Sequence, residues 1–131
     1  MITLFTSYYS CGDASRQKEI DFCFRKNVEN ENIKKLVVFI DDGSDVPLDH
    51  PKTDIITLDT RPTYQDWARL TNELEHGVSV LSNSDIFFDE TIAQLSDCLG
   101  GADNTFMALS RWEFSKETRE LHRNPHWSQD A

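Results

Sequence analysis

The stretch VLSNSDIFFDE, residues 80–90, places a polar and acidic tripeptide inside an apolar run. The tripeptide is Asn83, Ser84 and Asp85, with valine and leucine before it and isoleucine and two phenylalanines after it. Burying such polar groups is costly unless hydrogen bonds or a cation satisfy them. We therefore expect either a surface turn or a binding site here.

Apolar segments on both sides of this stretch alternate between strand-like and helix-like patterns. Strands are expected at residues 2–8, 36–40, 54–58, 78–81 and 105–109. Helices are expected at residues 15–28, at a segment that Thr63 and Asp66 cap and Gly77 ends, and after Asp89 as an N-cap. Tyr64 and Trp67 are expected in the core. This alternation predicts one α/β domain over residues 1–131, a three-layer sandwich with a mostly parallel sheet.

Composition narrows the classes of protein that this chain can belong to. Its 23 acidic residues against 13 Lys and Arg give a formal charge of -10, and no basic patch for nucleic acid is present. No apolar run is long enough for a membrane helix. Three cysteines, Cys11, Cys23 and Cys98, are odd in number and widely spaced, which favours free thiols and a reducing, cytoplasmic location.

Acidic residues follow two of the expected strands. Asp41, Asp42 and Asp45 come after residues 36–40, and Asp85 comes after residues 78–81. Parallel sheets bind ligands beyond the carboxyl ends of their strands. One interpretation is a Mg²⁺ or Mn²⁺ site whose cation bridges a diphosphate, because these cations prefer carboxylate and phosphate oxygens.

Two other interpretations of the acidic residues stay open. IFFDETI, residues 86–92, resembles the strand that carries the nucleophile of haloacid dehalogenase-like phosphatases, but Thr91 stands where their general acid belongs. The acid pair of response-regulator receivers follows the first strand, whereas Asp41 and Asp42 follow the second. Alternatively, the acidic residues are only turn and cap residues.

Three motifs in order resemble the GT-A glycosyltransferases, especially the inverting family two. They are VVFIDDGSD (37–45), WARLTNE (67–73) and GVSVLSNSDIFFDETIAQL (77–95). The resemblance extends over roughly residues 2–109. It implies a nucleotide-sugar donor and transfer of the sugar to an acceptor hydroxyl, with inversion.

The resemblance also implies a donor site at the strand ends. Its nucleotide-sugar contacts would come from Thr6, Tyr8, Asp42, Arg69, Asn83, Ser84, Arg111 and Trp112. Asp42 would hydrogen-bond the base, and Arg69 would lie near the diphosphate while Asn72 structures the turn. Asp85 would bind Mn²⁺ or Mg²⁺, with Asn83 or Ser84 near the ribose or a metal-bound water.

Residues 111–131 would begin the acceptor and catalytic region. Arg111 and Trp112 would line the sugar or acceptor site, and Asp130 would deprotonate the hydroxyl of a glycan, lipid or protein acceptor. Such enzymes normally continue beyond this point, so the chain is expected to be a C-terminally truncated form, a fragment, or a minimal domain that another chain completes. Exposed edges of an incomplete fold would favour a homo-oligomer. The alternative is a non-catalytic nucleotide-sugar binding or assembly domain, which Asn83 favours because it replaces the first acid of the Asp-x-Asp motif.

Overall fold

The computed structural model describes residues 1–74, 77–99, 105–109, 113–115 and 120–122. Its centre is a sheet of four strands, β1 (Ile2–Ser7), β2 (Lys35–Ile40), β3 (Thr53–Thr57) and β4 (Val78–Leu81). The strands lie in the order β3-β2-β1-β4, and every neighbouring pair is parallel. The expected α/β class with a parallel sheet is therefore confirmed.

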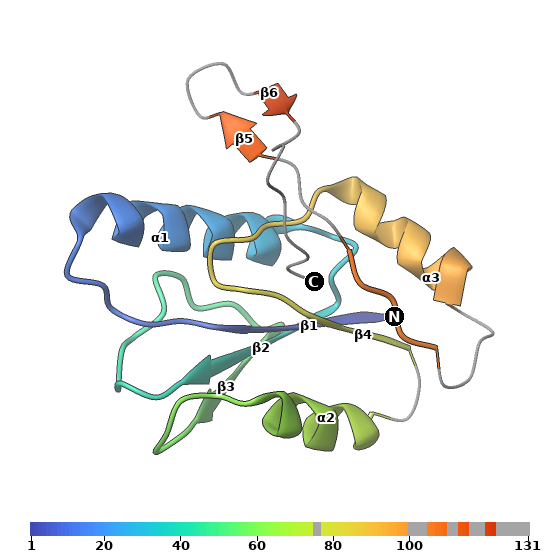
Figure 1. The fold of residues 1–131 in the computed structure, drawn as a ribbon, viewed down its shortest axis with the longest axis horizontal. Helices are drawn as coiled ribbons and strands as arrows, with labels where there is room; N and C mark the ends of the chain where they lie inside the picture. The colour runs from blue at the N-terminus through green and yellow to red at the C-terminus, as the bar shows by residue number, and fades with distance from the viewer. Residues whose placement is uncertain (75–76, 100–104, 110–112, 116–119, 123–131) are drawn as a thin grey trace.

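Helices cover both faces of this sheet. They are α1 (Ala14–Glu29), α2 (Tyr64–Asn72), the 3₁₀ turn η1 (Glu90–Ala93) and α3 (Gln94–Leu99). Figure 1 shows α1 and α3 on one face and α2 on the other, which gives three layers. A two-stranded antiparallel sheet, β5 (Glu113–Ser115) and β6 (Glu120–His122), follows and was not predicted. In the part of the chain that the structure describes, no helix is both long and apolar enough to cross a membrane.

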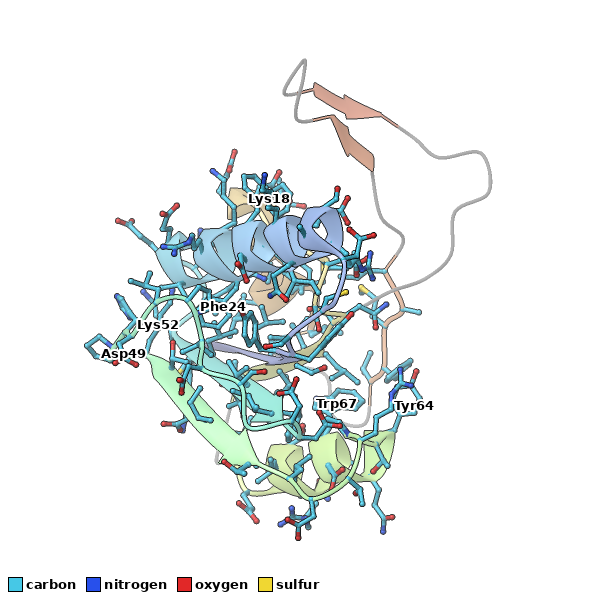
Figure 2. The ribbon with its side chains drawn as sticks, turned by 90° about the vertical axis from the view of Figure 1, so that its left-hand side faces the viewer. Lys18, Phe24, Asp49, Lys52, Tyr64 and Trp67 are labelled. Atoms are coloured by element: carbon cyan, nitrogen blue, oxygen red, sulfur yellow. The ribbon has the colours of Figure 1, made fainter. Side chains whose placement is uncertain are left out.

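The two faces of the sheet carry cores of different size. Neighbouring residues of a strand point to opposite faces, so Leu4 packs beneath α1 while Phe5 packs toward α2. The core beneath α1 contains Ile2, Leu4, Tyr8, Ile20, Phe24, Val28, Ile33, Leu36, Val38, Ile40, Val78, Val80, Ile92 and Leu95. On the other face, the buried hydrophobic residues of the described part of the chain are Phe5, Val37 and Phe39. In Figure 2, Phe24 of α1 and Trp67 of α2 lie on opposite sides of the sheet.

The expected cap of α2 is confirmed, but Tyr64, the residue after the N-cap, is not in the core. The Thr63 hydroxyl accepts from the backbone N–H of Asp66, and the Asp66 carboxylate accepts from the backbone N–H of Thr63. Tyr64 is 80% exposed, so its expected place in the core is wrong. Because helical side chains lean toward the N-terminus, the first residue of α2 extends past the end of the helix instead of covering the sheet.

Two boundaries also differ from the prediction. The helix that Gly77 was expected to end already stops at Asn72. Gly77 instead directly precedes β4 with a φ of 110°, and a Cβ there would lie 2.5 Å from the carbonyl oxygen of Met1. Residues 105–109 form no strand, and Phe106 is 78% exposed. Their apolar side chains suit a strand, but a strand forms only where a neighbour supplies hydrogen bonds, and the described sheet supplies none to them.

Candidate functional site

A cleft of about 590 Å³ lies at the carboxyl ends of the four parallel strands. It is lined by Ser7, Tyr8, Tyr9, Ser10, Arg16, Asp41, Asp42, Arg61, Pro62, Asn83, Ser84 and Asp85. From β1 the chain moves outward to β2 and β3, then crosses back to place β4 on the other side of β1. Open α/β sheets bind ligands at such a reversal of strand order, and the cleft has the volume of a small-molecule site.

Asp42 ties the loop after β1 to the loop after β2. Its Oδ2 accepts from the backbone N–H of Ser10 at 2.9 Å, and its Oδ1 accepts from the backbone N–H of Ser44 at 3.0 Å. The two serine hydroxyls lie 2.7 Å apart. Hydrogen bonds from Ser44 and then from Ser10 lower the pKa of Asp42. The exposed Asp42 therefore remains ionised at the mouth of the cleft.

Asp85 lies opposite Arg16, which sequence reasoning did not select. Arg16 is in the first turn of α1, and its guanidinium donates to Oδ2 of Asp85 at 3.1 Å and lies 3.4 Å from the Glu19 carboxylate. The neighbouring Tyr9 side chain and then the Asp85 charge raise the pKa of Arg16. The residue predicted to bind a metal is thus one half of an ion pair.

Amide side chains of α1 and of its C-cap residue hold the segment that follows Asp85. The Asn27 side chain donates to the carbonyl of Ile86 at 2.9 Å and accepts from the backbone N–H of Phe88 at 3.0 Å. Asn30 donates to the carbonyls of Phe88 and Asp89 at 2.9 and 3.0 Å. Residues 86–88 therefore bond to a helix and form no strand, which removes the context that the phosphatase interpretation requires. Asp89 caps η1, as expected.

Tyr8 supports the floor of the cleft instead of offering its hydroxyl to a ligand. The hydroxyl donates to the Asp21 carboxylate at 2.7 Å and accepts from the Gln17 amide at 3.1 Å. Its ring lies edge-on to Phe24, with the centroids 5.8 Å apart. Burial and then the bond to Asp21 raise the pKa of Tyr8 to about 12, so the phenol stays protonated at neutral pH.

The structure brings together five of the predicted site residues, namely Tyr8, Asp42, Asn83, Ser84 and Asp85. It does not bring two others to the cleft, since Thr6 is buried within β1 and Arg69 is exposed on α2. The remaining predicted residues, Arg111, Trp112 and Asp130, lie outside the described residues.

The cleft residues that were missed include both arginines of its lining, Arg16 and Arg61. The sequence positions of both arginines could have identified them. Arg61 follows β3 and Arg16 follows the turn after β1, so the rule that selected Asp42 and Asp85 also applies to them.

The acids of the cleft do not make a preformed metal centre. In the described residues, no three His, Cys, Asp or Glu side chains are grouped so as to hold a metal ion. Asp85 already accepts a hydrogen bond from Arg16, and both oxygens of Asp42 accept from backbone amides. Asp85 is thus a carboxylate that already has a cationic partner. The Mn²⁺ or Mg²⁺ that the resemblance implies stays a prediction.

Comparison with known proteins adds no assignment to this site. No protein-family model matches the chain, and no curated protein matches it either.

Proposed function

We propose that this chain is a GT-A-type glycosyltransferase domain that binds a nucleotide-diphosphate sugar in the cleft at the strand ends. The observation that carries the proposal is the position of the cleft beside the reversal of strand order between β1 and β4. Asp42, Ser84 and Asp85, selected from the sequence for this role, all line it.

The groups in the cleft suit the parts of a nucleoside diphosphate. Arg16 and Arg61 are cations that hydrogen-bond phosphate oxygens well. Asp42 is an exposed carboxylate that can accept from the N–H groups of a base, and Tyr9 adds an aromatic ring on which a base can stack. A nucleoside diphosphate is one molecule that uses all three kinds of group.

Transfer of the sugar follows from this mode of donor binding. The acceptor hydroxyl oxygen attacks the anomeric carbon while the bond from that carbon to the diphosphate breaks, which inverts the configuration. A general base takes the hydroxyl proton, and the resemblance assigns that role to Asp130. The site contributes placement of the two reactants and positive charge near the departing diphosphate.

A second candidate function is donor binding without turnover, in a binding or assembly domain. The ion pair of Asp85 with Arg16 and the presence of Asn83 in place of an acid favour it. Release of free sugar or transfer to an acceptor hydroxyl from a bound donor distinguishes the enzyme from the binding domain.

Calorimetric titration with UDP, GDP, CDP and dTDP, with and without Mn²⁺, tests the proposal. We expect one nucleotide to bind, and Ser84→Trp to abolish its binding because the indole fills the cleft. Ala68→Trp, on the exposed side of α2, is the matched control and keeps the native affinity. Circular dichroism verifies that each variant is folded. If the folded protein binds none of the four nucleotides, or if Ser84→Trp binds normally, the proposal is wrong.

A further inference from the structure

Two arginines reach the cleft from different elements. Arg16 comes from the first turn of α1, and Arg61 comes from the loop between β3 and α2. They meet a lining that contains three carboxylates, those of Asp41, Asp42 and Asp85. What the cleft can bind depends on which of these arginines and carboxylates already have partners within the protein.

Protein donors already engage two of the three carboxylates. Asp42 accepts backbone N–H groups at both oxygens, and Asp85 accepts from Arg16. Arg61 makes no ion pair within the described part of the chain. Among the described residues the cleft therefore offers one arginine, Arg61, without an ion pair, and a second, Arg16, whose carboxylate partners are Asp85 and Glu19.

The pair of Arg16 and Asp85 is weak enough to rearrange around a ligand. The Arg16 side chain is 42% exposed and that of Asp85 is 23% exposed. Ion pairs in such contact with water stabilise a protein by about 1 kcal/mol or less. A diphosphate offers a guanidinium two parallel charge-assisted hydrogen bonds, which are stronger and are oriented by the planar group.

We infer that Arg16 and Arg61 together bind the diphosphate of the nucleotide, and that Asp85 orients the Arg16 guanidinium instead of holding a divalent cation. This inference rests on the proposed function. The two guanidinium groups then supply the positive charge that stabilises the leaving diphosphate, so nucleotide binding in this cleft needs no Mn²⁺ or Mg²⁺.

The experiment is calorimetry on the chelator-treated full chain, with UDP, GDP, CDP, dTDP and inorganic pyrophosphate as probes. We expect one nucleotide to bind without added metal. Arg16→Met and Arg61→Met each weaken that binding by about tenfold to a hundredfold, because each removes a hydrogen-bonded charge. Arg69→Met is the matched control and leaves affinity unchanged, since Arg69 lies on α2 outside the cleft.

Asp85→Asn distinguishes the two possible roles of Asp85, orienting Arg16 or binding a metal ion, by whether nucleotide affinity rises or falls. Asn keeps an oxygen that can accept from and orient the Arg16 guanidinium, but it lacks the negative charge that competes with the diphosphate, so the metal-free affinity should stay the same or rise. Affinity that appears only with Mn²⁺, is lost in Asp85→Asn and is retained in Arg16→Met overturns the inference but keeps the proposed donor site. A folded chain that binds no nucleotide with or without Mn²⁺ overturns both.

Discussion

The two faces of the sheet differ in how firmly their helices are packed. α1 buries five residues, Ile20, Cys23, Phe24, Asn27 and Val28, whereas no residue of α2 is fully buried. α2 is fixed at its edge by polar contacts, since the Trp67 indole N–H donates to the Ser79 hydroxyl at 2.8 Å. The more extensively packed side of this domain therefore supports the cleft, because α1 supplies Arg16 at one end and bonds the loop after β4 through Asn27.

The largest expected effect tests this contrast directly, by truncating one aromatic residue on each face. Phe24→Ala should lower the free energy of unfolding by about 3–5 kcal/mol, because it opens a cavity in the larger core. Trp67→Ala should cost only about 2 kcal/mol because Trp67 is half-buried. Urea unfolding followed by circular dichroism gives both values. Tyr64→Ala, at an exposed position, should change stability by less than about 0.5 kcal/mol. Equal losses for Phe24→Ala and Trp67→Ala would show that the two faces are equally packed.

A smaller effect tests the hydrogen bonds between α1 and the segment that follows β4. Asn27 is only 2% exposed and bonds the carbonyl of Ile86 and the backbone N–H of Phe88. Asn27→Ala should cost about 2–3 kcal/mol, because both backbone groups lose their partner away from water. It should also weaken nucleotide binding, because the Asn83–Asp85 turn loses its support.

Asn72→Ala is the matched control for this change. Asn72 is exposed at the end of α2, so its replacement should leave stability and binding almost unchanged. Chemical unfolding and calorimetry on the two variants provide the comparison. If Asn27→Ala costs no more than Asn72→Ala, the hydrogen bonds from α1 do not support the cleft.

The fold was predictable where hydrophobic period and local capping agree. The four strands of the parallel sheet and the cap of α2 by Thr63 and Asp66 follow from such local patterns. Residues 105–109 were not predictable in this way, because their apolar composition suits a strand but says nothing about whether a neighbouring strand is available. The same limit applies to residues 86–88, whose backbone groups bond to side chains of α1 far away in the sequence.

The candidate site was predictable in position and less so in chemistry. The carboxyl ends of the strands give its place, and this rule correctly selected Asp42 and Asp85 as cleft residues. The sequence cannot show that Asp85 faces Arg16, 69 positions earlier, so a paired carboxylate resembled a metal ligand. Arg69 does not line the cleft, because its motif is local while the face on which α2 packs is decided by the whole sheet.

The smallest expected effect concerns the cap on the loosely packed side. The Thr63 hydroxyl accepts from the backbone N–H of Asp66 at 3.3 Å and donates to the Asp66 carboxylate at 3.0 Å. Thr63→Ala should lower the free energy of unfolding by about 1 kcal/mol, and Thr63→Ser, which keeps the hydroxyl, by less. A loss from Thr63→Ala that exceeds that from Trp67→Ala would mean that capping, and not packing, holds α2 on the sheet.

The pH dependence of this cap has a definite sign. Hydrogen bonds from the backbone N–H and then the hydroxyl of Thr63 lower the pKa of Asp66. Because the pKa is lower in the folded state, the ionised carboxylate adds stability above the unfolded-state pKa, and that stability is lost as the pH falls through the folded-state pKa. The native chain should therefore be more stable than Asp66→Asn at neutral pH, and thermal unfolding should show the difference shrinking on acidification. A difference that stays constant from neutral to acidic pH would mean that the Asp66 charge does not stabilise α2.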